Sequence, residues 1–382
     1  MKKIVIVNAV PTNNGDAALV FALYNKLKEM GYDVFISTTN YRVIKNLYPD
    51  KNWIKSEYDF NKILRIVFKI LPCLKKTILK FKIKNNKQYR NTDIIICAPG
   101  GYINSYYGIK EKLYCSNIIK NLYNSKLIMY SQSVGPLNKK DYNVLDKYIY
   151  NFDLFMARDE ISYENIKKYP NVIKTNDAAF LLNTINNKKK DNGDKIAISV
   201  REWNHDGRSK EQYVNLIRNI TYVCIDKGMR VEFISTCQGL KSYVDDSKMA
   251  KYIVKDMDDK YKKFIEINNN YYTLDTLREY ISNFKFTIGT RLHMCILSIM
   301  SGIPAFNISY EVKGKECYKI LDLSEYSIDY NDNIKHSIQK LDAFIDNKRL
   351  KDIYLEKAKH MNMEANMYFE YMITNVIESD RK

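Results

Sequence analysis

Short runs of consecutive apolar residues, each followed by a polar turn, recur along this chain of 382 residues. The segment Asp93–Ala98 (DIIICA) is one such run, and Lys126–Ser131 and Leu154–Ala157 are others. Strands of parallel sheets show this pattern because helices cover both of their faces. Segments with helical periodicity, such as Ala17–Met30, lie between the runs. The alternation predicts an α/β protein built on doubly wound parallel sheets.

A second series of the same kind starts after a polar segment, 184–194 (TINNKKKDNGD), which we interpret as an interdomain linker. The chain is also too long for one ordinary hydrophobic core, so two domains are expected. We predict an N-terminal domain over 1–183, the linker, a C-terminal domain over 195–345, and a final helix over 346–382 that crosses back to the N-terminal domain. Two such Rossmann-like domains facing each other across a cleft make a glycosyltransferase-B-like architecture.

The remaining elements follow from the same two patterns of apolar residues. Further strands are predicted at Lys3–Asn8, Asp33–Ser37, Ile196–Val200, Val231–Ser235, Lys285–Ile288 and Ala305–Ile308. Further helices are predicted at Glu211–Lys227, near Ser242–Val254, from Leu292 onward, and over Lys348–Glu378.

Composition indicates a globular protein of the cytoplasm. Hydrophobic residues make up 46% and charged residues 27% of the chain, a balance that excludes a largely disordered protein. No apolar stretch approaches the roughly 20 residues of a membrane-spanning helix, and the first apolar run is too short for a signal peptide. The seven cysteines form no CxxC pair, so we expect small buried side chains in a reducing compartment.

The net charge of +17 is concentrated in residues 61–90, which hold ten Lys or Arg and no Asp or Glu. Apolar residues alternate with these cations at spacings of three and four, with one break at Pro72. One interpretation is a basic amphipathic segment that lies on an anionic bilayer at the inner face of the cytoplasmic membrane. The other is a pair of ordinary surface helices. No nucleic-acid-binding signature is present, so no nucleic-acid partner is predicted.

The first motif that could carry chemistry is Asn13-Asn14-Gly15-Asp16, between a strand and a helix. Gly15 would allow a close backbone approach and expose the amides of the helix N-terminus. Asp16 suits the N-cap position, or the role of a general base toward an acceptor hydroxyl. A simple turn and cap is the alternative interpretation.

Two further motifs follow strands of the first series. Gly100-Gly101-Tyr102-Ile103-Asn104 comes after Asp93–Ala98, and paired glycines there would let a ligand lie against the backbone. Arg158 follows Leu154–Ala157, and its planar fork suits a carboxylate or a phosphate. The alternative for Arg158 is a structural ion pair with Asp159 or Glu160.

The most informative motif, Thr290-Arg291-Leu292-His293, leaves a strand at Gly289 and opens an apolar helix. An arginine at a helix N-terminus can clamp an anion that the amides already favour, and a histidine there can donate a proton. In the same domain, Arg201 ends the first strand, and His205 follows in a loop where we expect an exposed side chain. Lys313 would add another cation, or be a solvated loop lysine.

Taken in order, these motifs resemble the polysaccharide pyruvyl transferase family. The series is NNGDAAL, GGYIN, SQSVGPL, ARDEIS, DAAFLL, SVRE, IGTRLH and SGIPAFNISYEVKGK, and it covers about Ile4 to Lys315. The resemblance implies a glycosyltransferase-B-like fold and the transfer of pyruvate from phosphoenolpyruvate to a sugar, as a ketal. The positions that match the family's donor site are Arg158, Arg291, Leu292, His293 and Lys313.

These expectations combine into a hypothetical mechanism. His293 protonates the vinyl carbon of phosphoenolpyruvate, and Asp16 assists attack by a sugar hydroxyl. Arg158, Arg291 and Arg201 hold the anionic groups. An acceptor sugar, which on one hypothesis is lipid-linked, would meet the residues of the two glycine-containing loops: Asn14, Gly15, Gly100, Gly101, Tyr102 and Asn104. No cluster of metal ligands is visible in the sequence, so neither a metal nor another cofactor is predicted.

Two alternatives belong to other functional classes. A sugar-nucleotide glycosyltransferase of the same fold would also use cations and a helix N-terminus for phosphate, with Glu311 available for ribose hydroxyls. A non-catalytic carbohydrate- or membrane-binding protein would account for the 32 tyrosines, since aromatic faces stack on sugars. Binding of a nucleoside diphosphate would favour the first, and absence of donor binding would favour the second.

Overall fold

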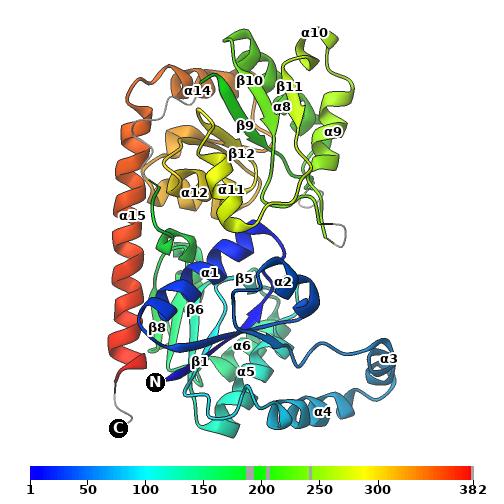
Figure 1. Cartoon of the computed structure of the whole chain (residues 1–382), viewed down its shortest axis with the longest axis vertical. Coiled ribbons are helices and arrows are strands. Elements are labelled where there is room, and N and C mark those ends of the chain that lie inside the picture. Colours follow the sequence, from blue (N-terminus) through cyan, green and yellow to red (C-terminus); the bar gives the residue numbers. More distant parts are fainter. Residues whose placement is uncertain (186–192, 204–206, 241–242, 380–382) are drawn as a thin grey trace. The chain divides into compact units, whose positions relative to one another are not determined.

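The computed structural model describes residues 1–185, 193–203, 207–240 and 243–379 (Figure 1). The chain divides into two compact units. The first unit contains Met1–Thr12, Asp16–Leu181 and Glu364–Lys382, and the second contains Asn13–Gly15 and Leu182–Met363.

The first unit is built around a parallel sheet in the order β3-β2-β1-β4-β6-β7-β8, with β5 also paired to β6. Its strands are β1 (Lys3–Ala9), β2 (Asp33–Thr38), β3 (Trp53–Lys55), β4 (Ile94–Cys97), β5 (Gly100–Ile103), β6 (Lys126–Val134), β7 (Leu154–Ala157) and β8 (Val172–Lys174). The strand order reverses direction between β1 and β4. Ligands of open parallel sheets bind at the carboxyl ends of strands beside such a reversal.

Helices connect these strands. They are α1 (Asn14–Glu29), α2 (Tyr41–Leu47), α3 (Lys62–Ile70), α4 (Pro72–Asn85), α5 (Lys110–Tyr123), α6 (Lys139–Ile149) and α7 (Glu160–Ile166), followed by the 3₁₀ turn Ala178–Leu181. Pro72 opens α4, where its missing N–H removes no helical hydrogen bond. The predicted break at Pro72 is therefore the boundary between two helices.

The second unit repeats the plan with a parallel sheet in the order β11-β10-β9-β12-β13-β14. Its strands are β9 (Lys195–Ser199), β10 (Arg230–Phe233), β11 (Ile265–Ile267), β12 (Thr287–Gly289), β13 (Ala305–Ser309) and β14 (Ser327–Asp329). This order is that of the dinucleotide-binding Rossmann sheet, and its reversal lies between β9 and β12.

The helices of the second unit are α8 (Lys210–Asp226), α9 (Ser247–Lys255), α10 (Asp259–Lys262), α11 (Leu274–Ile281), α12 (Leu292–Met300), α13 (Val312–Ile320) and α14 (Ile334–Asp346), with a 3₁₀ turn at Ser324–Tyr326. The helix α15 (Leu350–Met372) contributes residues to both units and continues into the π-helical turn Ile373–Ile377. That turn belongs to the first unit, where Lys2 Nζ donates to the Ile377 carbonyl at 2.6 Å and Lys126 Nζ donates to the Val376 carbonyl at 2.6 Å.

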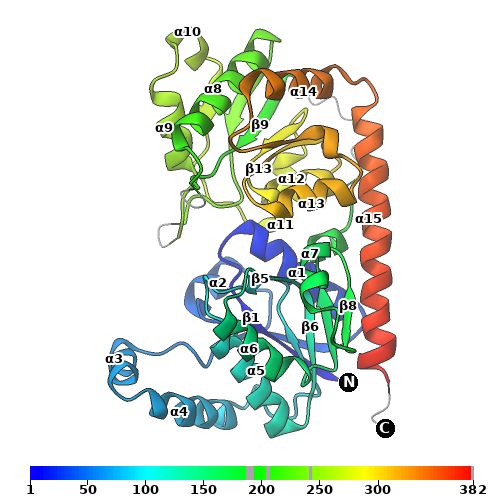
Figure 2. The same ribbon diagram turned by 180° about the vertical axis from the view of Figure 1, so that it is seen from behind.

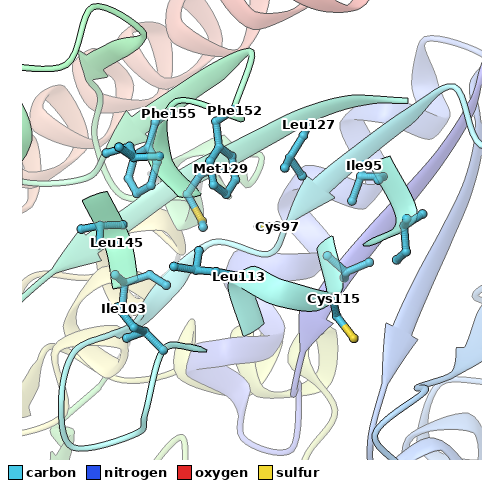
Figure 3. Close-up of a cluster of buried hydrophobic side chains, with 14 of the residues drawn as sticks. Ile95, Cys97, Ile103, Leu113, Cys115, Leu127, Met129, Leu145, Phe152 and Phe155 are labelled. Carbon is cyan, nitrogen blue, oxygen red and sulfur yellow. The ribbon is translucent and has the colours of Figure 1, made fainter. Parts of the chain in front are cut away.

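The core of the first unit forms where one face of its sheet meets the helices that cover it (Figure 3). Successive side chains of a strand point to opposite faces, so residues two apart share a face. Ile95 and Cys97 of β4 therefore lie beside Leu127 and Met129 of β6, all fully buried. Helical side chains, including Leu113 of α5, complete the cluster. This packing fixes the strand register on which the loops at the carboxyl ends depend.

The predicted α/β class with two parallel sheets is confirmed, and the strand Leu154–Ala157 was predicted with the observed bounds. Helix α1 begins at Asn14, so the prediction of Asp16 as its N-cap is wrong: Asp16 lies in the first turn, where its charge still complements the helix dipole. His205, the residue Ser242 that opens a predicted helix, and positions 186–192 of the predicted linker lie outside the described residues. Within the described ranges, no helix is long and apolar enough to cross a membrane.

Candidate active site

The loops that follow β9 and β12 lie at the strand-order reversal of the second unit and are tied to each other. The amide of Thr290 donates to the Ser199 carbonyl at 2.8 Å. The buried hydroxyl of Tyr213, from α8, lies 2.7 Å from Thr290 Oγ1 and accepts from the Arg201 amide at 3.2 Å. Tyr213 in turn stacks on Tyr330, with ring centroids 3.9 Å apart. These contacts hold the backbone segments that carry Arg201 and Arg291 in place.

Arg291 precedes α12 and forms a two-pronged ion pair with Asp246. Its Nε donates to Asp246 Oδ2 at 2.8 Å and its terminal nitrogen to Oδ1 at 2.7 Å. The two side chains are only 16% and 3% exposed. Burial alone would lower the pKa of Arg291, but the charge and hydrogen bonds of Asp246 outweigh it and the pKa is raised. Ser235 Oγ, after β10, also donates to Asp246 at 2.6 Å. Arg291 is therefore a fixed cation that has N–H donors beyond the two bonded to the carboxylate.

His293 is the second residue of α12, where the helix dipole is positive. The turn before it requires glycine, because a Cβ on Gly289 would come within 2.5 Å of Cys295 Sγ. Leu292, between the two candidate residues, is buried at 8% exposure. His293 is thus half-buried on a mostly apolar helix, two residues after the ion-paired Arg291.

The segment Asn13–Gly15 belongs to the second unit and lies against this helix start. The Asn14 amide donates to the Thr236 carbonyl at 2.9 Å, and its side chain donates to the Tyr272 carbonyl at 2.9 Å. The backbone of Gly15 is so close to His293 that a Cβ there would lie 3.0 Å from both Cβ and Nδ1 of the histidine. The predicted acceptor residues Asn14 and Gly15 are therefore neighbours of the candidate acid.

We expect Gly15→Ala to lower kcat about tenfold without unfolding the protein. The added methyl would come closer to His293 than the roughly 3.5–4.0 Å of favourable carbon contacts, so the imidazole must shift, and small misplacements of reacting groups are costly. Gly31→Ala is the control, because nothing lies within 4 Å of a Cβ at Gly31 but its φ of +84° strains an alanine. Gly31→Ala should lower the melting temperature and leave kcat unchanged. Unaltered kcat in Gly15→Ala would contradict the argument.

Arg201 lies in an aromatic setting. Its guanidinium is 4.9 Å from the ring centroid of Trp203 and 4.6 Å from that of Tyr310, whose hydroxyl accepts a hydrogen bond from Arg201. Lys313, in the first turn of α13, pairs with Glu311 at 2.5 Å and is 38% exposed. Lys313 is therefore an ion-paired residue at a helix start rather than a solvated loop lysine.

In the first unit, Arg158 is 6% exposed and pairs with Asp177 at 2.9 Å. Its Nε and a terminal nitrogen donate to Ser133 Oγ at 3.0 and 2.7 Å, and that hydroxyl donates to Asp159 Oδ2 at 2.6 Å. The predicted alternative ion pairs with Asp159 and Glu160 are wrong. Asp159 caps α7 through the Ser162 amide, and Glu160 pairs with Lys174. The motifs SQSVGPL, ARDEIS and DAAFLL thus meet at one arginine.

The glycine pair of β5 borders this network. A Cβ on Gly101 would lie 3.6 Å from a terminal nitrogen of Arg158, so the backbone of the loop passes directly beside the guanidinium. Two predicted acceptor residues bond within their own loop instead: Tyr102 Oη donates to the Ala98 carbonyl at 2.9 Å, and Asn104 Nδ2 donates to the Gly101 carbonyl at 2.6 Å. They hold the shape of the segment around β5, the short strand to which Gly100 and Gly101 belong although the sequence placed them in a loop.

Three residues near these loops were missed by sequence reasoning. Asp177 and Asp246 are the partners of the two arginines. Asp177 lies within the motif DAAFLL, but it follows β8, a strand of three residues that the apolar pattern did not predict. Asp246 had no comparable signal, since it lies well beyond the end of β10.

Lys112 of α5 lies over the Tyr102 ring at 4.6 Å, and burial lowers its pKa to about 8. A lysine with such a pKa beside a candidate site can exchange protons near neutral pH.

Comparison with known proteins places this geometry in a family. Amylovoran biosynthesis protein AmsJ of Erwinia amylovora is 24% identical to this chain, over 91% of the chain and 92% of that protein. Among solved structures, a glycosyltransferase from Rickettsia africae is 12% identical, with a TM-score of 0.62 and 99% of both chains covered. UDP-GlcNAc 2-epimerase from Methanocaldococcus jannaschii is 10% identical, with a TM-score of 0.59 and coverage of 97% of this chain and 100% of that one.

The structural similarities show the fold: two Rossmann-like domains of the glycosyltransferase-B type. The family model of polysaccharide pyruvyl transferase matches residues 13–312, which include all of the candidate site residues except Lys313. This chain therefore belongs to the polysaccharide pyruvyl transferase family.

Proposed function

We propose that this protein transfers pyruvate from phosphoenolpyruvate to a saccharide of a cell-surface polysaccharide, or its lipid-linked precursor, and forms a pyruvate ketal. Membership of the family and the similarity to AmsJ support a transferase of polysaccharide biosynthesis. The observation that carries the donor assignment is the fixed cation Arg291 at the N-terminus of α12, two residues before His293. Phosphoenolpyruvate has a carboxylate and a phosphate close together, and preorganised cations with helix amides are a natural receptor for both.

The proposed reaction has two bond-forming steps at one carbon. His293 gives a proton to the vinyl CH₂ of phosphoenolpyruvate, which becomes the methyl group of pyruvate. A sugar hydroxyl adds to the cationic C2 and loses its proton to a base, for which Asp16 is the candidate. A neighbouring hydroxyl then displaces inorganic phosphate from C2, gives its proton to the departing phosphate and closes the ketal. The cations stabilise the departing phosphate, and no metal takes part in these steps.

The first unit would bind the acceptor. The backbone of Gly101 passes beside Arg158, and parallel sheets bind ligands at this edge. The hydrogen bonds from Arg158 to Asp177 and Ser133 would hold its guanidinium in place beside Gly101, where it could bind an anionic group of the donor, the role that the resemblance implies for Arg158.

The alternative donor is a sugar nucleotide. The second unit has the Rossmann strand order, and the structures of similar fold include an epimerase named for UDP-GlcNAc. Diphosphates also bind at the first turn of a helix that follows a strand of such a sheet. A direct comparison of donors separates the two.

The test is a thermal-shift titration with phosphoenolpyruvate, UDP, GDP and CMP. Binding to the folded state stabilises by about 2.7 kcal/mol at a ligand concentration 100 times Kd, so specific stabilisation by phosphoenolpyruvate is expected. Arg291→Met/Asp246→Leu removes the ion pair without leaving one buried charge behind, and it should abolish the shift. Arg218→Met/Asp256→Leu, a pair between α8 and α9, is the charge-matched control and should retain it. Stabilisation by a nucleotide alone would overturn the proposed donor.

A further inference from the structure

Helix α3 of the first unit presents isoleucines outward. The side chains of Ile63, Ile66 and Ile70 are 71%, 59% and 72% exposed, and their spacing of three and four places them on one face of the helix. Leu71, Leu74 and Phe81 continue the exposed apolar residues along α4, at 48%, 41% and 68% exposure. We call these six residues the apolar face. Soluble helices normally turn polar residues to solvent, so such a set of exposed apolar side chains indicates a contact surface.

The apolar face is not unused core, because other side chains of the same helices already dock them on the unit. Phe68 packs edge-on against Phe60, with ring centroids 4.8 Å apart. Leu79 and Ile83 of α4 are 1% and 0% exposed within the core cluster. Both overall views show α3 at the end of α4 that lies away from the sheet of this unit (Figure 1, Figure 2).

Lysines accompany the apolar face. Lys80, Lys84 and Lys87 are exposed, and no Asp or Glu occurs between residues 61 and 90. On the helical wheel of α4, Lys80 and Lys84 lie next to the stripe that holds Leu74 and Phe81. Two other lysines serve the fold: Lys75 pairs with Glu111, and Lys82 Nζ donates to the Glu57 carbonyl at 2.6 Å.

We propose that α3 and α4 form a docking surface for an anionic lipid bilayer. The apolar face would enter the boundary between headgroups and acyl chains, and the lysines would lie at the lipid phosphates. Charge complementarity favours an anionic bilayer as the partner, because a segment whose charged residues are all basic is attracted to a negative surface. The exposed isoleucines select a bilayer over a nucleic acid, whose phosphates offer them no apolar partner. The inference does not depend on the proposed reaction.

Vesicle flotation with the full-length protein tests it without measuring turnover. We expect the wild-type protein to float with vesicles of equal parts phosphatidylcholine and phosphatidylglycerol, and to stay at the bottom with phosphatidylcholine alone. Ile66→Ser/Ile70→Ser and Lys80→Gln/Lys84→Gln/Lys87→Gln should each lower the partition coefficient at least about tenfold. Raised salt should weaken binding of the wild type and of the isoleucine variant more than that of the lysine variant.

Matched controls exist on other elements. Lys248→Gln/Lys251→Gln/Lys255→Gln removes the same charge from exposed positions of α9, and Met363→Ser/Met367→Ser removes two exposed apolar side chains from α15. Both should float as the wild type does. Failure of the wild type to float, or equal losses in the controls, would overturn the proposal. Sedimentation without lipid tests the alternative that the apolar face binds a second copy of the chain. That alternative would replace the proposal if the wild type forms dimers and Ile66→Ser/Ile70→Ser is monomeric.

Discussion

Replacing His293 by alanine should lower kcat by roughly 100-fold or more while leaving the protein folded. The expectation follows from its proposed role as the acid that protonates the vinyl carbon, since a positioned general acid contributes about 10²–10⁴-fold. The imidazole is half-buried at the start of α12 and touches Gly15, so its removal opens little space in the core. The measurement is phosphate release from phosphoenolpyruvate in the presence of the saccharide acceptor.

The control for this prediction is His336→Ala. His336 is an exposed histidine of α14 in the same unit, and its backbone amide, not its side chain, takes part in the helix cap. It should retain wild-type kcat. His293→Gln adds a sharper readout, because glutamine can donate a hydrogen bond but cannot release a proton. If the proton is what the imidazole contributes, this variant should lose kcat as His293→Ala does. Near-normal kcat in His293→Ala would exclude the role of acid.

The fold was predictable because its signals are local. Each central strand of the two sheets is a run of apolar residues, as in Ile94–Cys97, and such a run can be read without knowing its neighbours. Several short strands were missed for the same reason. Trp53–Lys55, Ile265–Ile267 and Ser327–Asp329 have three residues each, too few to establish a pattern. They gain their structure from pairing with longer strands, which is information that lies elsewhere in the chain.

The site was predictable only in part. The rule that polar side chains follow the carboxyl ends of parallel strands selected Arg158, Arg201 and Arg291, and each does follow such a strand. Their partners depend on contacts between distant segments: Arg291 and Asp246 are 45 residues apart in the sequence. A sequence pattern shows which residue leaves a strand, but the carboxylate that fixes it is set by how the loops pack. The same limit applies to Asn14, whose hydrogen bonds reach residues more than two hundred positions away.

Alanine in place of Arg291 should cost about 3–5 kcal/mol of unfolding free energy, apart from any loss of activity, because breaking a buried ion pair leaves an uncompensated charge. The charge left without its partner would be the carboxylate of Asp246, whose side chain is 3% exposed. Among the described residues, Ser235 would still donate a hydrogen bond to it. For a unit of this size, that loss corresponds to a fall of roughly 10 °C in melting temperature. Differential scanning calorimetry gives the value directly.

Replacing both residues of this pair separates the cost in stability from the loss of donor binding. Arg291→Met/Asp246→Leu replaces both charges with apolar groups of similar volume, which is often close to neutral for stability. The double variant should therefore melt nearer to the wild type than Arg291→Ala does, while binding phosphoenolpyruvate no better. Recovery of stability without recovery of binding would show that the lost binding comes from the missing arginine and not from instability, as expected if Arg291 contacts the donor. If the double variant regained binding as well as stability, Arg291 would be a structural residue of the second unit and the donor's anions would have to meet other cations, such as Arg201.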